Sequence, residues 1–158
     1  MSDDVERLRE ELKPIAEAAT DLKWADKRPW KAETHVFWES AVPTVDLHDL
    51  NAKLAKKAVL QACTHESETG ALFFVTGRGR HSLGPGVLGG VVKSELKKIC
   101  DGKDWSFRPA GPAKYVLITD RKKAPGAATG ALGPLFWLFV GLLAAGLAAV
   151  IWNNFAAG

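Results

Sequence analysis

The stretch Ala71-Leu72-Phe73-Phe74-Val75-Thr76 decides the fold, because it is an unbroken apolar run with the length of a strand. Such a run predicts a strand that is covered on both faces. Val42 to Leu47 reads as an earlier strand, and Asn51 is a suitable N-cap for a helix that runs to about Cys63. A strand, a helix and a second strand in this order predict an α/β unit with a right-handed crossover.

Two further strands and one helix complete the predicted domain. Residues 87–99 place apolar side chains, beginning with Val87, at helical spacing on a predicted buried face. Short strands are predicted over residues 105–108 and 114–119. The order over residues 41–120 is therefore β-α-β-α-β-β, which predicts a two-layer α/β sandwich with at least partly parallel pairing.

Residues 1–40 are predicted to form a helical and aromatic arm that precedes this domain. Apolar residues recur at helical spacing over residues 3–22, where Pro14 kinks or divides the helix. The stretch that follows carries four large aromatic rings, those of Trp24, Trp30, Phe37 and Trp38. These rings either lie against the domain or offer surfaces on which nucleic-acid bases stack.

Residues 131–152 read ALGPLFWLFVGLLAAGLAAVIW and contain no charged side chain. As a helix this run would be about 33 Å long, which is enough to cross the hydrocarbon core of a membrane. Trp137 and Trp152 lie near its ends, where aromatic rings favour the membrane interface. A buried core helix is the alternative, but such a helix usually keeps a polar side. We therefore expect one transmembrane helix that anchors the chain in a lipid bilayer.

The charged N-terminus has the features of neither a signal peptide nor a transit peptide, so a single-pass, tail-anchored membrane protein is predicted. The basic run at residues 121–123 places the globular part on the cytoplasmic side by the positive-inside tendency. Residues 121–130 read as a basic and flexible linker. Gly141, Ala145 and Ala149 form a row of small residues that would let two such helices pair as a homodimer.

Charge is divided unevenly along the chain. Residues 1–40 hold 10 acidic and 7 basic residues, whereas residues 41–123 hold 8 acidic and 14 basic ones. A basic domain attracts polyanions, because neutralising phosphates releases their counterions. Cys63 and Cys100 lack the spacing of metal ligands and are expected to be small buried residues.

Asp46 and His48 are candidate catalytic residues at the end of the first predicted strand. They are two residues apart, so their side chains are expected to point to the same face. A carboxylate beside an imidazole sets its tautomer, which would let His48 act as general base or acid toward a group attacking phosphorus. The alternative is that Asp46 caps the nearby turn and His48 is an ordinary polar residue.

The glycine-rich turn that follows Val75 is the second candidate segment. Its glycines permit positive φ and a close approach of a ligand to backbone amides, and its cationic side chains would hold phosphate oxygens. An ordinary turn and a dinucleotide-binding loop are the alternatives, and Ser82 disfavours the latter, because G-x-G-x-x-G needs glycine there. Because ligands bind beyond the carboxyl ends of strands, both segments are expected to face one crevice. The candidate phosphate-binding residues are Thr76, Gly77, Arg78, Gly79, Arg80 and His81.

These two segments resemble signatures of the Smr domain, the small MutS-related module. Val45-Asp46-Leu47-His48 is similar to the family's L-D-x-H-G, and Thr76-Gly77-Arg78-Gly79 is similar to its T-G-x-G, which His81-Ser82 continues in the usual way. Gly86-Val87-Leu88 resembles the family's G-V-L helix opening. The resemblance covers about residues 41–120.

The resemblance implies an α/β sandwich similar to the C-terminal domain of translation initiation factor three. It also implies nuclease activity on DNA or RNA, including mRNA on stalled ribosomes, so nucleic acid and ribosomes are the expected partners and RNA is the favoured substrate. Carried over by position, Asp46 and His48 are the catalytic pair, and Gly77, Arg78 and Gly79 bind the backbone. A metal ion, with Mg²⁺ as the candidate, is needed only if metal-activated water is the attacking group.

Three positions depart from the family pattern. Asp49 stands where the family has glycine, and its carboxylate would repel phosphate unless it binds a metal ion or points away as a helix cap. Gly111-Pro112 stands where a Gly-Gly turn is common, and Gly89 stands where a basic residue is usual. These departures motivate the alternative function, a non-catalytic adaptor that tethers nucleic acid or ribosomes to a membrane.

Overall fold

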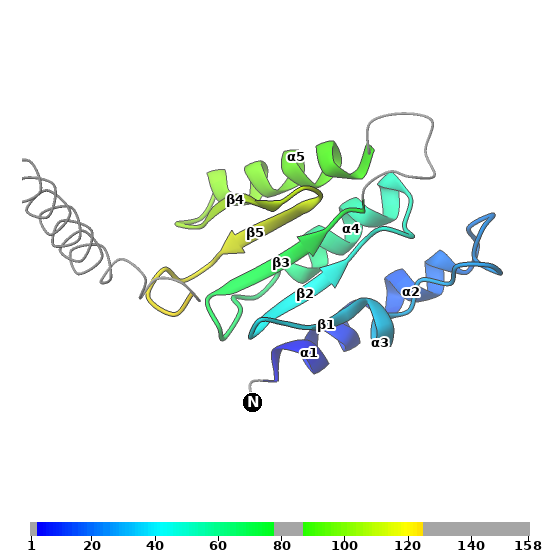
Figure 1. Ribbon diagram of the computed structural model, residues 1–158, viewed down its shortest axis with the longest axis horizontal. Helices are drawn as coiled ribbons and strands as arrows, with labels where there is room; N and C mark the ends of the chain where they lie inside the picture. The colour runs from blue at the N-terminus through cyan, green and yellow to red at the C-terminus, as the bar shows by residue number, and fades with distance from the viewer. Residues whose placement is uncertain (1–2, 78–86, 125–158) are drawn as a thin grey trace, which may run out of the picture. The chain divides into compact units, whose positions relative to one another are not determined.

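The computed structural model describes residues 3–77 and 87–124, which form an α/β fold with one five-stranded mixed sheet (Figure 1). The strand order in the sheet is β1-β2-β3-β5-β4. The elements along the chain are α1 (Asp4–Glu11), α2 (Lys13–Ala19), α3 (Ala32–His35), β1 (Val36–Glu39), β2 (Val42–Asp46), α4 (Ala52–Ala62), β3 (Ala71–Val75), α5 (Val87–Asp101), β4 (Ser106–Gly111) and β5 (Lys114–Ile118).

Three predicted segments lie outside the described residues. They are the membrane-spanning helix over residues 131–152, the linker from residue 125 onward and the loop over residues 78–86. Within residues 3–77 and 87–124, no helix has the length and apolar character needed to cross a bilayer.

β2 and β3 are parallel neighbours, and α4 is the crossover between them. The register pairs Thr44 with Phe73 and Asp46 with Val75, so both strands end at the same edge of the sheet. The other strand pairs, β1 with β2, β3 with β5 and β4 with β5, are antiparallel. The expected strand–helix–strand unit and its partly parallel pairing are therefore confirmed.

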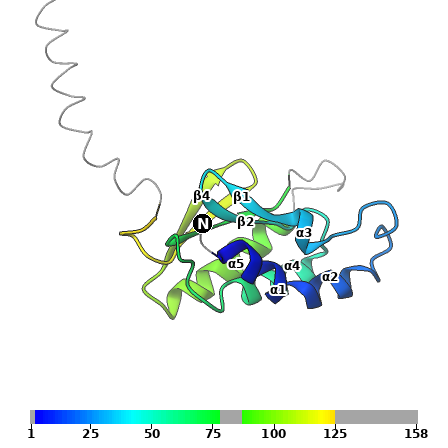
Figure 2. The ribbon, with the colours of Figure 1, turned by 90° about the horizontal axis from the view of Figure 1, so that it is seen from below.

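The core lies between one face of the sheet and a layer of helices. Figure 2 shows α1, α2, α4 and α5 on one side of the sheet. Leu72 and Phe74 of β3 point into this core and are buried, whereas Phe73 is only half-buried on the opposite face. Across the described residues, that opposite face carries a small apolar cluster rather than a second helical layer. Within the described residues, helices cover the central strand on one face only, which agrees with a two-layer fold. The prediction that this strand is covered on both faces is therefore wrong.

Residues 3–40 belong to the same compact unit as the predicted domain, so they are not a separate arm. Leu8 and Leu12 are 1% and 0% exposed in the shared core, and β1 pairs with β2 at the edge of the sheet. The helix divides before Pro14, as expected, into α1 and α2. Trp30 is 3% exposed and lies against the domain, whereas Trp24 is 40% exposed. The apolar face of α1 and α2 is buried in this core, and this burial is the physical reason why residues 3–40 join the domain.

Asp4 ties α1 to the loop that precedes β3. Its carboxylate is 1% exposed and accepts hydrogen bonds from Ser67 Oγ at 2.8 Å and from the backbone N–H of Glu68 at 2.9 Å. Arg7 Nη2 donates to the other oxygen at 2.9 Å. A buried carboxylate with this many donors is satisfied, so Asp4 fastens the N-terminal helix to the central strand.

The helices follow the predicted pattern with one exception. Asn51 Oδ1 accepts a hydrogen bond from Leu54 N at 2.8 Å, which confirms the N-cap of α4. In α5, Leu96 is fully buried, but Val87 is 63% exposed, so its predicted place on the buried face is wrong. At about 100° per residue, Val87 and Leu96 project from opposite sides of the helix.

The two cysteines are reduced and unpaired. Cys63 is buried, as expected, and burial raises the pKa of its thiol to about 12. Cys100 is only half-buried, and burial also raises the pKa of its thiol above the usual range. At both residues burial therefore disfavours the thiolate, which is the reactive form of cysteine.

Candidate functional site

The two candidate segments meet where β2 and β3 end. Beyond the last register pair, Asp46 with Val75, the backbone N–H of Leu47 still donates to Val75 O at 2.8 Å. The parallel pairing therefore continues until the chain turns at His48 on one strand and at Thr76 on the other. The two segments therefore lie side by side at this edge of the sheet.

Asp46 holds His48 by two contacts. Its Oδ1 lies 2.7 Å from His48 Nδ1 and also accepts the backbone N–H of His48 at 3.1 Å. The two alternatives for Asp46, capping the turn and orienting the imidazole, are thus both realised by one oxygen. Because β2 ends at Asp46, the turn rather than the strand pleat brings the pair together. The side chain of His48 is 45% exposed and is accessible to a ligand.

Asp49 points toward His48 rather than away from it. Its Oδ2 lies 2.9 Å from His48 Nε2, and its side chain is 13% exposed. Asn51 caps α4, so the expectation that Asp49 is a helix cap is wrong. The other expectation for Asp49, that it binds a metal ion, is compatible with this position.

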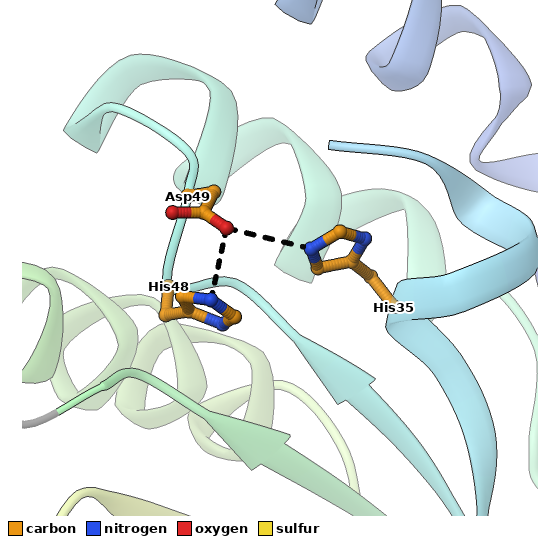
Figure 3. Close-up of side chains that lie close together, drawn as sticks. All are labelled: His35, His48 and Asp49. Carbon is orange, nitrogen blue, oxygen red and sulfur yellow. Dashed lines mark ion pairs between the residues drawn. The ribbon is translucent and has the colours of Figure 1, made fainter. Parts of the chain in front are cut away.

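His35 joins the cluster and was not among the predicted site residues. Its Nε2 lies 3.7 Å from Asp49 Oδ2, and its ring stacks on that of Trp30 at a centroid separation of 5.3 Å. Figure 3 shows the ring of His35 turned toward Asp49. His35 ends α3 directly before β1, and the antiparallel pairing of Val36 with Val45 carries it to the end of β2. Only the pairing of β1 with β2 brings His35 to the site, so this pairing would have had to be predicted from the sequence to find it.

Two tryptophans from the N-terminal segment support the site. Trp30 Nε1 donates to Asp46 O at 2.7 Å, and Trp24 Nε1 donates to Asp49 O at 2.9 Å. These bonds hold the backbone on both sides of His48. The rings predicted to face either the domain or a nucleic acid therefore have a structural role here, and only Trp24 leaves a large part of its ring exposed.

Gly77 packs directly against His48. It has a φ of +70°, and a Cβ built on it would lie 2.8 Å from the Cβ of His48. The expected positive φ is confirmed, and its reason is the close approach of the two chain segments. Arg78, Gly79, Arg80 and His81 lie outside the described residues.

Thr76 lines a hollow beyond β3 and is bonded to the neighbouring turn. It is 5% exposed, and both its N–H and its Oγ1 donate to Ala113 O, at 2.9 and 3.2 Å. These bonds fasten the end of β3 to the turn between β4 and β5.

A hollow of about 440 Å³ lies beyond the end of β3. Its lining includes Gly77, Gly89 and the turn that contains Gly111-Pro112. A Cβ on Gly89 would lie 3.9 Å from Thr76 Oγ1 and from Tyr115 Oη, so a longer side chain at this position would project toward the hollow. The lack of a side chain at Gly89 thus leaves this hollow wider than a basic residue at that position would. Lys114 also lines the hollow and forms an ion pair with Glu39.

No family model, no curated protein and no solved structure matches this chain. The chemical roles of its residues therefore depend on the contacts described above. Those contacts give one exposed imidazole between two carboxylates, a second imidazole beside it, and a hollow bordered by the glycine that touches His48.

Proposed function

We propose that the chain is a membrane-anchored nuclease of the Smr type that cleaves the phosphodiester backbone of nucleic acid, with RNA favoured over DNA. The observation that carries the proposal is the 2.7 Å contact between Asp46 Oδ1 and His48 Nδ1, beside the first glycine of the cationic loop. A carboxylate on Nδ1 leaves Nε2 as the nitrogen that exchanges a proton with substrate.

The fold supports the same assignment. The order β2-α4-β3-α5-β4-β5 and the single helical layer are those expected of a sandwich similar to the C-terminal domain of translation initiation factor three. α1, α2, α3 and β1 extend this order at the edge formed by β2. The uncharged run at residues 131–152 supports the membrane anchor, and the basic run at residues 121–123 supports the cytoplasmic placement of the domain; both belong to the proposal.

On RNA, His48 Nε2 would accept the proton of the ribose 2′-hydroxyl. The 2′-oxygen then forms a bond to phosphorus while the bond between phosphorus and the 5′-oxygen breaks, and the leaving oxygen takes up a proton from solvent. The products are a 2′,3′-cyclic phosphate and a 5′-hydroxyl end. Asp46 would stabilise the imidazolium that forms when His48 is protonated.

Digestion of labelled RNA and DNA by the full chain tests the proposal. We expect cleavage of RNA, and a loss of at least about 100-fold in rate for His48→Ala, the scale of general acid–base catalysis. His65→Ala is the matched control, because His65 Nδ1 also lies 2.9 Å from a carboxylate, that of Glu11, away from the site. Absence of cleavage on both substrates, or equal rates for wild type and His48→Ala, would contradict the proposal.

A second candidate function is a non-catalytic adaptor for nucleic acid or ribosomes. The contact of 2.9 Å between Asp49 Oδ2 and His48 Nε2 favours it, because the nitrogen needed for proton transfer already faces a carboxylate. The adaptor would bind nucleic acid with strong salt dependence and without cleavage. Arg78→Ala/Arg80→Ala should then weaken binding and lower the salt slope by about 1 for each lost phosphate contact, whereas His48→Ala should leave binding unchanged.

A further inference from the structure

We propose that His35, His48 and Asp49 bind one divalent transition-metal ion of the Zn²⁺ class. This inference goes beyond the proposed function, because it assigns a ligand to residues of which one, His35, lies outside every predicted motif. The ion would occupy His48 Nε2, the nitrogen that accepts the substrate proton in the proposed function, so that general base belongs to the metal-free chain. The inference stands without nuclease activity, since metal binding can be measured with no nucleic acid present.

The three candidate ligand atoms surround a common point. Asp49 Oδ2 lies 2.9 Å from His48 Nε2 and 3.7 Å from His35 Nε2, and all three atoms lie within 4.8 Å of one another (Figure 3). Ligands at zinc-bond lengths in a tetrahedral site are about 3.4 Å apart. Closing the longest separation to that value requires side-chain movements of about 1–1.5 Å in total.

Both imidazoles are held by their other nitrogen. His48 Nδ1 contacts Asp46 Oδ1 at 2.7 Å, and His35 Nδ1 lies 2.9 Å from Lys31 O. Metal-bound histidines usually donate this second N–H to a carboxylate or a backbone carbonyl, which leaves Nε2 as the ligand. The amide N–H of Lys31 donates to His35 Nδ1 at 3.1 Å, and Thr34 Oγ1 lies 2.9 Å from the same nitrogen. The bond from Lys31 favours the opposite tautomer, which carries its proton on Nε2. The opposite tautomer, however, would aim its Nε2–H at Asp49 Oδ2 from 3.7 Å, beyond hydrogen-bond distance.

The two carboxylate contacts of His48 are both favourable only if a positive charge lies between His48 and Asp49. A neutral imidazole carries one N–H, so it can donate to Asp46 or to Asp49 but not to both. The second contact then brings a lone pair of Nε2 within 2.9 Å of a carboxylate oxygen. Either a second proton on His48 or a cation shared with Asp49 removes this repulsion. A cation would at the same time engage Nε2 of His35, which a proton on His48 would not.

The surroundings hold the three residues in place. Asp49 and His35 have side chains that are 13% and 11% exposed, and the ring of Trp30 stacks on that of His35. The bond from Trp24 Nε1 to Asp49 O fixes the backbone of the acidic ligand. Rigid support of this kind lowers the cost of assembling a binding site.

Two imidazole nitrogens and one carboxylate oxygen select the type of ion. Zn²⁺, Co²⁺ and Mn²⁺ accept this mixed set, whereas Mg²⁺ and Ca²⁺ prefer oxygen ligands throughout. Mg²⁺, the cofactor candidate from the sequence, is therefore a poor fit to these three residues. Three protein ligands leave a coordination position for a water molecule or a phosphate oxygen. The ion would also offset the repulsion between the Asp49 carboxylate and a phosphate.

Metal titration of the full chain, stripped with a chelator, tests the inference. We expect one Co²⁺ per chain, seen by visible absorption of the bound ion and displaced by Zn²⁺, and a rise in melting temperature with added Zn²⁺. The near-isosteric variants His35→Gln and Asp49→Asn should each weaken binding by at least about 10-fold, since loss of a residue that only supports a metal ligand already costs that much. His65→Ala is the matched control and should bind as the wild type does.

Melting curves in chelator show whether the variants fold, so a loss of binding can be separated from a loss of structure. Wild-type binding no tighter than that of folded Asp49→Asn, or fewer than one ion per two chains at saturation, would overturn the inference. Binding of one ion by a chain that cleaves no nucleic acid would refute the nuclease and leave the metal site intact. Cleavage that survives chelation in a chain that binds no ion would support the nuclease and overturn the metal site.

Discussion

At the scale of single residues, Gly77 shows how closely the two motif segments approach each other. Its φ of +70° is energetically costly for residues that have a Cβ. A Cβ added at Gly77 would also lie only 2.8 Å from the Cβ of His48, which is too close. The glycine is therefore needed for the packing of the site, whatever its loop binds. Gly90 offers the contrast, because a Cβ added there would meet nothing within 4 Å.

We expect Gly77→Ala to lower the free energy of unfolding by at least about 1–2 kcal/mol, the cost of a left-handed backbone alone. The contact with His48 adds to this loss. Gly90→Ala, within α5, should raise stability by about 0.5–1 kcal/mol, because glycine is unfavourable inside a helix. Urea unfolding followed by tryptophan fluorescence measures both changes. Equal midpoints for Gly77→Ala and wild type would contradict the close packing of Gly77 against His48.

At the scale of elements, the hairpin of β1 and β2 carries His35 to the site. Its two-residue turn, Ser40-Ala41, has positive φ at both positions, 51° and 63°. Positive φ at both central residues is the type I′ geometry, which matches the twist of the strands and strongly prefers Asn-Gly. Ser-Ala is a poor match to that preference, so the turn conveys no hairpin signal. The sequence pattern therefore placed the segment in an arm.

The poor match of Ser40-Ala41 to a type I′ turn leads to a prediction about the stability of the hairpin. Replacing the turn by Asn-Gly, as Ser40→Asn/Ala41→Gly, should raise the free energy of unfolding by about 0.5–1 kcal/mol, because glycine removes the strain of positive φ. Ala18→Gly, on an exposed position of α2, is the matched control and should lower stability by up to about 1 kcal/mol. Thermal unfolding of the two variants gives the comparison. A double variant less stable than wild type would exclude a strained turn.

At the scale of the whole molecule, residues 3–40 complete the core instead of preceding it. Leu8, Leu12 and Val36 are at most 1% exposed, and β1 forms the edge of the sheet beside β2. Each buried residue of this kind contributes about 1.5–3 kcal/mol, and a domain is stable by only about 5–15 kcal/mol. Loss of the N-terminal segment would therefore remove most of the net stability.

A chain that begins at residue 41, the start of the predicted domain, should accordingly fail to fold. We expect no cooperative thermal transition and poor dispersion of its amide resonances. The control is a chain that ends at residue 125, where the first compact unit ends, and it should keep a cooperative transition. A chain starting at residue 41 that melts as cooperatively as this control would show that the N-terminal segment is dispensable.

Local patterns in the sequence were enough for the order β2-α4-β3-α5-β4-β5 and for the meeting of His48 with Gly77. Both follow from hydrophobic periodicity, an N-cap and the rule that the ends of parallel strands share an edge. Asp46 and His48 are close in the chain, so their pairing is also local. These features could be predicted because neighbours along the chain determine them.

Only the tertiary structure decided that His35 and Asp49 face His48 and that residues 3–40 complete the core. His35 arrives through an antiparallel edge pairing across an atypical turn, and Asp49 turns toward His48 where Trp24 of the N-terminal segment holds its backbone carbonyl. Which edge of a sheet receives a further strand depends on the apolar surface that is left to cover, and that surface exists only once the other elements have packed.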